Sequence, residues 1–196
     1  MTNIKRITIA DNEEYLRQIS EEVDFNDKSY LEDVKKLEEF CIHNEVFAMA
    51  AIQIGIPKRI IYLKNTTTDL SKNMESNYNE SKVLINPTIL SRKGHTRYLE
   101  GCASCLDYCG VVERPYQLEV EYYTITGDKR VETFIGFPAT VVSHENDHLY
   151  GVFHMDIALE VLRLTPKERT AYREMHPYEI LDKDKEYFGR EKQKLI

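Results

Sequence analysis

The sequence predicts an α+β fold in which antiparallel β-sheet surrounds one central helix. Apolar and charged residues alternate from Leu118 to Tyr122, and turn residues at 126–128 lead into a second run, Arg130 to Ile135. This pattern is typical of an antiparallel hairpin. Pro138 suits the first turn of a helix that begins directly after the hairpin. Because the strand-like runs gather before this helix, we expect the sheet to wrap around it.

The remaining elements can be assigned in chain order. Apolar residues recur at helical spacing between positions 31 and 41, and Asn26 or Asp27 is the expected N-cap of that helix. A strand is predicted at Arg59–Leu63, and the polar stretch 64–82 is expected to be an exposed loop. The capping box Thr165–Glu168 opens a further helix that should end near residue 176. We predict one domain over 1–170, followed by a charged extension over 171–196. The part of this extension that follows the helix is expected to form a solvated helix or a frayed tail.

Composition excludes several classes of protein. The 196 residues suffice for one domain with a substantial core, and the net charge of −7 argues against direct binding of nucleic acid. No apolar run is long enough to span a membrane, and the first residues do not resemble a signal segment. The four cysteines suggest no secreted disulfide framework, and we expect Cys105 and Cys109 to be spectators. A cytoplasmic protein is therefore predicted.

The segment His144-Glu145-Asn146-Asp147-His148 has the spacing of a metal site. Histidines four residues apart lie on one face of a helix, and the apolar residues on either side of the segment argue against a solvated charge run. A metal ion held there lowers the pKa of water, and Glu145 is placed to accept the proton. Such sites use three protein ligands, and this segment supplies two.

Two residues compete to be the third ligand. Read forward, the pattern continues through Gly151 to His154, as in the metzincin proteases. Read backward, Cys102 in the segment Glu100-Gly101-Cys102-Ala103-Ser104 offers a thiolate, which suits iron(II) or zinc.

Three segments in this order and spacing resemble the peptide deformylase family: 50–55 (Ala-Ala-Ile-Gln-Ile-Gly), 100–104 and 144–148. The similarity extends from about residue 4 to about residue 170. The metzincin alternative leaves the first two segments unexplained, and His154 is then expected in a strand or loop beyond the metal-binding helix. The resemblance implies removal of formate from N-terminal formylmethionine. It also implies an α+β fold of antiparallel sheets around the metal-binding helix.

The resemblance also implies roles for individual residues. Cys102, His144 and His148 would hold one divalent ion, with Fe(II) expected and Zn or Ni possible. Glu145 would be the general base, while the Gln53 side chain and the Ala103 backbone N–H would stabilise the oxyanion. The substrate would be an N-formylated peptide, including nascent chains at the ribosome.

The expected substrate contacts come from the same comparison. An apolar pocket for methionine would involve His144 and the aromatic or aliphatic residues Phe47, Tyr98, Phe137 and Val141, with Val46, Ala48, Glu100 and Gly101 nearby. Glu100 is expected to orient the segment that carries Cys102, and Asp147 to form an ion pair. Arg114 is expected either to contact the substrate downstream of its first residue or to form a surface salt bridge.

The chain departs from the family pattern mainly at the binding surface. Val46 and Ala48 occupy positions where the first motif usually has glycine, and their side chains should narrow or reshape the pocket. Ala103, Thr140 and Ser143 also differ from the usual residues. Two alternatives therefore remain: an amidase that acts on a different N-acyl substrate, and a non-catalytic protein that binds formyl peptides.

Overall fold

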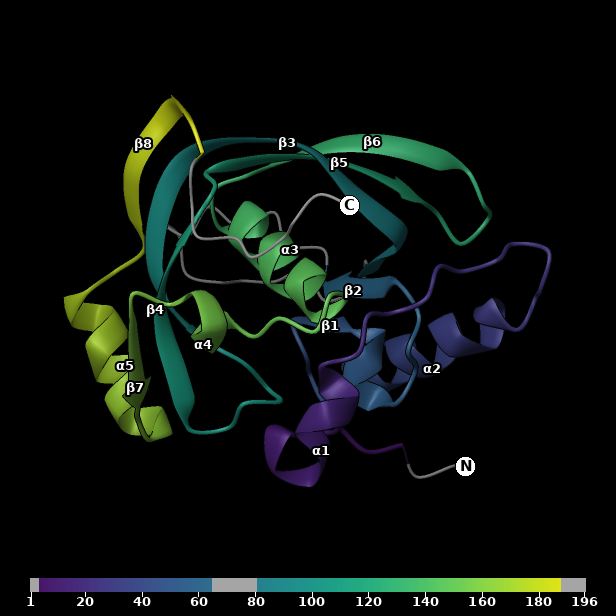
Figure 1. Ribbon diagram of the computed structural model, residues 1–196, viewed down its shortest axis with the longest axis horizontal. Coiled ribbons are helices and arrows are strands. Elements are labelled where there is room, and N and C mark those ends of the chain that lie inside the picture. Colours follow the sequence, from purple (N-terminus) through teal and green to yellow (C-terminus); the bar gives the residue numbers. More distant parts are fainter. Residues whose placement is uncertain (1–3, 65–80, 188–196) are drawn as a thin grey trace.

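A computed structural model describes residues 4–64 and 81–187 (Figure 1). In chain order these residues form α1 (Ile9–Leu16), α2 (Tyr30–His43), β1 (Ala48–Ala50), the 3-10 helix η1 (Ala51–Ile54), β2 (Ile60–Lys64), β3 (Ser81–Gly101), β4 (Tyr108–Arg114), β5 (Gln117–Tyr123), β6 (Lys129–Ile135), α3 (Phe137–His148), α4 (His154–Ile157), β7 (Glu160–Arg163), α5 (Pro166–Met175) and β8 (Glu179–Glu186). None of these helices is long and apolar enough to cross a membrane.

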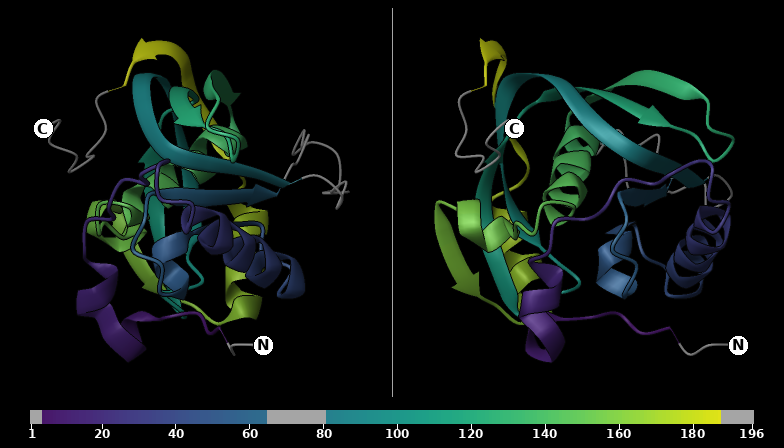
Figure 2. Two further views of the ribbon diagram at one scale, coloured as in Figure 1. Left: turned by 90° about the vertical axis from the view of Figure 1, so that its right-hand side faces the viewer. Right: turned by 45° about the vertical axis from the view of Figure 1, so that its right-hand side comes forward.

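The long strand β3 organises the sheet. The described strands form one eight-stranded sheet in the order β1-β2-β3-β4-β7, with β5 between β3 and β6, and β8 also on β3. All of these pairings are antiparallel. Register shifts interrupt β3 near residues 85–91 and 93–96. Such irregularities bend a strand, and β3 curves over α3 in both further views (Figure 2).

Helix α3 lies inside the fold, under the curved sheet (Figures 1 and 2). Eight of its twelve residues are buried, and they include both polar and apolar side chains. A helix buried around most of its circumference belongs to the interior rather than to an amphipathic surface layer. Val142 and Leu149 pack against Leu118, Val120 and Phe134 of the hairpin. The sheet therefore fixes the position of the helix that carries the two histidines.

The predicted α+β fold with antiparallel sheet around one helix is confirmed. The hairpin (β5 and β6), strand β2, helix α2 and the capping box of α5 are also confirmed. Neither Asn26 nor Asp27 is the N-cap of α2. That residue is Ser29, whose N–H and hydroxyl donate to the Asp27 carboxylate. The predicted loop at 64–82 lies almost wholly outside the described residues.

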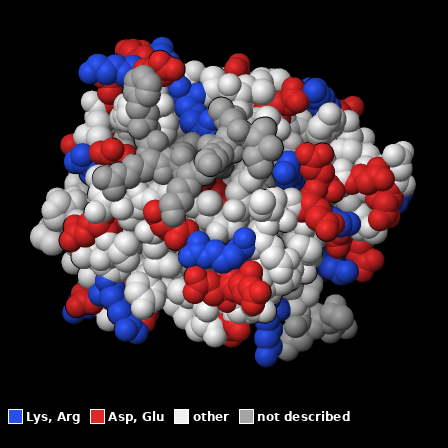
Figure 3. Space-filling model, viewed as in Figure 1, with Lys and Arg blue, Asp and Glu red and all other residues white. Residues whose placement is uncertain are grey.

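The expectation of a solvated helix or a frayed tail after the helix that ends near residue 176 is wrong for the segment Glu179–Glu186. This segment forms β8, which pairs with β3 from Lys93 to Arg97, starting at the residue where the pairing with β5 ends. Basic and acidic side chains lie together at this corner of the molecule, at the upper left of Figure 3. Gly94 permits the approach of β8 to β3: its φ is +72°, and a Cβ there would lie 2.7 Å from the Asp182 carbonyl oxygen. The domain division after residue 170 stays a prediction, and it falls within α5.

Candidate metal centre and active site

Two segments bring three potential metal ligands together. His144 and His148 lie one turn apart on α3, and Cys102 directly follows the end of β3. One ligand atom from each of these residues lies within 4.8 Å of the other two. The Cys102 Sγ atom is 3.2 Å from His148 Nε2, and both side chains are buried. A thiolate and two imidazoles in a closed setting fit one ion of the zinc or iron(II) type.

His154 is close to this group without belonging to it. It begins the short helix α4, so the expectation of a strand or loop residue there is wrong. Its buried ring stacks on His144, with 5.6 Å between the ring centroids. The group of potential ligands is completed by Cys102, and His154 packs against the ring of the ligand His144.

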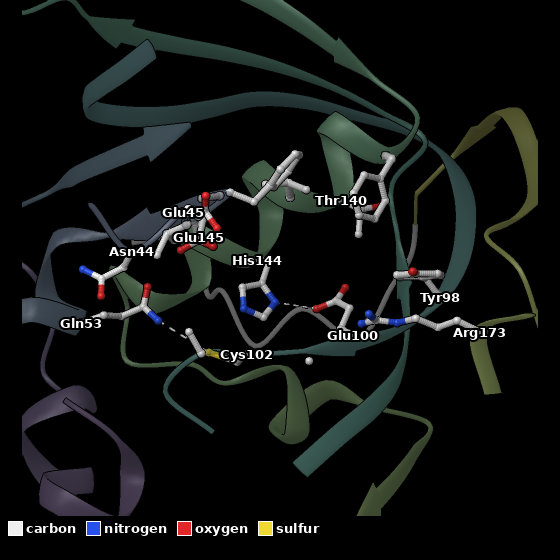
Figure 4. Close-up of a pocket in the computed structure, with 17 residues that line it drawn as sticks. Asn44, Glu45, Gln53, Tyr98, Glu100, Cys102, Thr140, His144, Glu145 and Arg173 are labelled. Atoms are coloured by element: carbon white, nitrogen blue, oxygen red, sulfur yellow. Dashed lines mark hydrogen bonds and ion pairs between the residues drawn. The ribbon is translucent and has the colours of Figure 1, made fainter. Parts of the chain in front are cut away.

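Glu100 fixes the orientation of His144. The Glu100 Oε2 atom lies 2.8 Å from His144 Nδ1, which leaves Nε2 of the same ring for the metal (Figure 4). A carboxylate that accepts the second ring N–H is a common partner of a metal-binding histidine, because it sets the tautomer and makes the ligand more basic. The expected orienting role of Glu100 thus extends beyond the Cys102 segment to a direct contact with a ligand.

Arg114 lies at the centre of a buried ion network. Its Nε and one terminal nitrogen donate to Glu100 at 2.8 and 3.0 Å, and its other terminal nitrogen donates to Asp147 at 2.5 Å. Burial opposes the charge on Glu100, but Arg114 and His144 outweigh it and hold the pKa of that carboxyl well below its usual range. Burial likewise opposes the charge on Arg114, yet the two carboxylates raise the pKa of its guanidinium above the ordinary value.

Both expectations for Arg114 need correction. The side chain is 1% exposed, so it does not form a surface salt bridge. It is also absent from the residues that line the cavity beside the ligands, so it is not placed to contact substrate there. The ion pair expected for Asp147 is present, and its partner is Arg114.

A cavity of about 350 Å³ opens beside the ligands (Figure 4). Apart from Arg114, every residue expected to contact substrate lines it: Val46, Phe47, Ala48, Tyr98, Glu100, Gly101, Phe137 and Val141. Aromatic rings form one wall, with centroid distances of 6.2 Å for Phe47–Phe137 and 5.5 Å for Tyr98–Phe137. Asn44, Glu45 and Arg173 also line the cavity and were not predicted. No local pattern in the sequence marks these three residues, since all lie in polar segments.

The predicted catalytic groups border the same cavity. Gln53 is held in place because its Oε1 atom accepts from the Ala50 N–H at 2.9 Å. Its Nε2 donates to Ser104 Oγ at 3.0 Å and lies 3.6 Å from Cys102 Sγ. Burial raises the pKa of Glu145 to about 7, and its Oε2 atom has no hydrogen-bond partner within residues 4–64 and 81–187. A carboxylate with such a pKa suits proton transfer near neutral pH.

Comparison with known proteins agrees with this geometry. The family model for polypeptide deformylase matches residues 4–162. The chain belongs to the polypeptide deformylase family. Members of this family are hydrolases that act on N-formylated peptides, with a single metal ion.

Individual relatives support the assignment. The peptide deformylase of Bartonella tribocorum is 35% identical over 149 residues, which cover 76% of this chain and 81% of the relative. That of Pelagibacter ubique is 40% identical over 109 residues, which cover 55% of this chain and 59% of the relative. Among solved structures, a probable peptide deformylase from Synechococcus phage S-SSM7 matches with a TM-score of 0.67 and 33% identity, covering 79% of this chain and 99% of the phage protein.

A second solved structure is relevant to the substrate. It is a class I type b peptide deformylase from Acinetobacter baumannii with Met-Ala-Ser bound, which matches with a TM-score of 0.68 and 27% identity. The match covers 78% of this chain and 96% of that one.

Proposed function

We propose that this chain removes the formyl group from the N-terminal formylmethionine of nascent peptides. The observation that carries the proposal is the convergence of Cys102, His144 and His148 beside a cavity that Glu145 also lines. Family membership supports the reaction, and the Met-Ala-Ser complex of the Acinetobacter relative supports a peptide of this kind as ligand. We further propose that the activity is cytoplasmic and that its substrates include chains still attached to the ribosome.

Each catalytic residue has a distinct task in the proposed mechanism. Cys102, His144 and His148 would hold a divalent ion, which would supply Lewis acidity toward the formyl carbonyl and a lowered pKa for water. Glu145 accepts the proton of the attacking water and returns it to the departing amine, which balances the hydrolysis. The Gln53 amide and the Ala103 N–H donate to the oxyanion as the carbonyl carbon becomes tetrahedral. Glu100 holds the His144 ring in place throughout.

Membership of the deformylase family supports Fe(II) as the proposed native metal, with Zn or Ni as substitutes. A thiolate with two imidazoles binds several of these ions, so ligand chemistry alone does not separate them. The methionine side chain would lie against the wall that contains Phe47, Tyr98 and Phe137. Val46 and Ala48 also line the cavity. Their side chains would leave less space for a substrate than glycine would.

A comparison of acyl groups tests this function. Formate release from formyl-Met-Ala-Ser and acetate release from acetyl-Met-Ala-Ser are measured on the same preparation of metal-loaded protein. We expect a strong preference for the formyl peptide, because the formyl carbon carries only hydrogen and the cavity excludes larger acyl groups. Equal or faster hydrolysis of the acetyl peptide would favour the amidase alternative. Binding of the formyl peptide without turnover would favour the non-catalytic alternative.

A further inference from the structure

The cavity receives a cationic side chain from a part of the chain that the family match does not cover. The match ends at residue 162, whereas Arg173 lies on α5, which spans Pro166–Met175. Arg173 nevertheless lines the same cavity as His144 and Glu145. In Figure 4 its guanidinium points inward from the side opposite Asn44 and Glu45. The C-terminal segment thus contributes a charged group to a site that is otherwise built by the family core.

The contacts of Arg173 hold the side chain while leaving part of its guanidinium available. Nε and one terminal nitrogen donate to the Leu99 carbonyl oxygen at 3.1 and 2.9 Å. The guanidinium also lies over the Tyr98 ring, with 5.0 Å from its carbon to the ring centroid. These contacts use the side edge of the guanidinium. The end edge is formed by the two terminal nitrogens, and Arg173 takes part in none of the ion pairs found among residues 4–64 and 81–187.

The fixed orientation has a chemical consequence. The end edge of a guanidinium presents two parallel N–H donors that match the two oxygens of a carboxylate. Because Leu99 and Tyr98 already restrain the side chain, little further conformational entropy is lost when this edge binds a ligand. Apart from the ligand His144, the other charged residues that line the cavity are acidic. They are Glu45, Glu100 and Glu145. Arg173 is therefore the cavity-lining group suited to an anionic ligand.

We propose that Arg173 is a specificity-determining residue that binds a carboxylate of the substrate downstream of formylmethionine. The proposal rests on the proposed deformylase function. That carboxylate can belong to an acidic side chain at the second or third residue, or to the free C-terminus of a short formyl peptide. In either case the substrate occupies the cavity with its formyl group at the metal ligands and its carboxylate at Arg173.

Matched peptides and variants test this assignment. The reference substrates are formyl-Met-Ala-Ser-amide and formyl-Met-Asn-Ser-amide, which carry no carboxylate. The test substrates are formyl-Met-Asp-Ser-amide, formyl-Met-Ala-Asp-amide and formyl-Met-Ala-Ser with a free C-terminus. For the preferred test peptide we expect Arg173→Gln to lower kcat/KM about five- to tenfold, mainly through KM, with less than about a twofold change for the references. Arg173→Lys keeps the charge without the paired donors. Its kcat/KM for the preferred test peptide should therefore lie between those of wild type and Arg173→Gln.

Arg169→Gln is the control variant. Arg169 lies one helical turn earlier on α5, donates to the Leu106 carbonyl oxygen and does not line the cavity. Its substitution should leave the preference for the test peptides unchanged. Comparison of the three test peptides shows whether a side chain or the C-terminus supplies the carboxylate.

Several outcomes would overturn the proposal. One is a wild-type protein that hydrolyses test and reference peptides equally well. Another is an Arg173→Gln variant that loses the same factor on every peptide, because that result indicates only a structural role through Leu99. A wild-type protein that releases formate from none of the peptides would instead refute the proposed function.

Discussion

Replacement of Arg114 by methionine tests whether the buried ion network stabilises the fold and the metal ligands together. Arg114 is 1% exposed and binds the carboxylates of Glu100 and Asp147. Methionine has a similar length and no charge, so both carboxylates would stay buried without their cation. Glu100 also contacts His144, so loss of Arg114 should disturb a metal ligand as well.

The expected loss of folding free energy follows from the burial of these ion pairs. Removal of one partner from a buried ion pair costs about 3–5 kcal/mol of folding free energy, because the remaining charge is uncompensated. For a chain of this length, each kcal/mol lowers the melting temperature by about 2–4 °C, so a decrease of about 6–20 °C is expected. Arg97→Met is the matched control. Arg97 pairs with Glu113 at 2.8 Å but its side chain is 41% exposed, and exposed pairs contribute about 0–1 kcal/mol.

Urea unfolding should be measured for both variants with excess chelator and again with bound metal, since an ion that binds only the folded state adds its own stabilisation. Arg114→Met combined with Asp147→Asn should recover part of the loss, because the second change neutralises one of the two unpaired carboxylates. A free energy of unfolding for Arg114→Met within about 1 kcal/mol of wild type would contradict the expected role of the buried network. So would an equal loss for Arg97→Met.

The remaining predictions concern the general base, the third ligand and a turn beside the site. Glu145→Gln should lower formate release at least about 100-fold with metal content unchanged, and near-normal turnover would exclude Glu145 as the base. Cys102→Ala should lose bound metal, whereas His154→Ala should retain it; the reverse result in metal analysis would make His154 the ligand. Gly151→Ala should cost more than about 2 kcal/mol in thermal unfolding, because φ is +67° and its Cβ would lie 2.1 Å from the Arg17 carbonyl oxygen. Gly127→Ala, with its nearest contact at 3.6 Å, should cost clearly less, and equal losses would count against this account.

Parts of the fold that depend on local patterns could be predicted from the sequence. The alternation in β5 and the helical spacing in α2 are each complete within one segment. Strand β3 was not predicted as a whole, because its bends place Asn86, with φ of +50°, and Gly94 inside the strand. Asparagine and glycine are also common in turns, so their presence argued against one continuous strand. Strand β8 is mostly exposed and highly charged, so its pairing with β3 left no apolar pattern to detect.

The residues of the candidate site also differ in whether the sequence alone could indicate them. Contiguous motifs indicated Cys102, His144, His148 and Glu145, because their spacing alone specifies a shared face or segment. The burial of Arg114 depends on the meeting of β3, β4 and α3, which supply Glu100, Arg114 and Asp147 respectively. Arg173 reaches the cavity only because α5 packs beside the end of β3. Neither arrangement is encoded in a short stretch of sequence, so the structure was needed to find them.

The proposed role of Cys102, His144 and His148 is to hold one catalytic metal ion in a deformylase. Its most direct test is metal analysis and formate release from formyl-Met-Ala-Ser, measured on one anaerobically purified sample. We expect about one divalent ion per chain, formate release that chelator abolishes, and recovery when Fe(II) is restored. A folded protein that holds no metal, or that holds one ion and releases no formate, would contradict it.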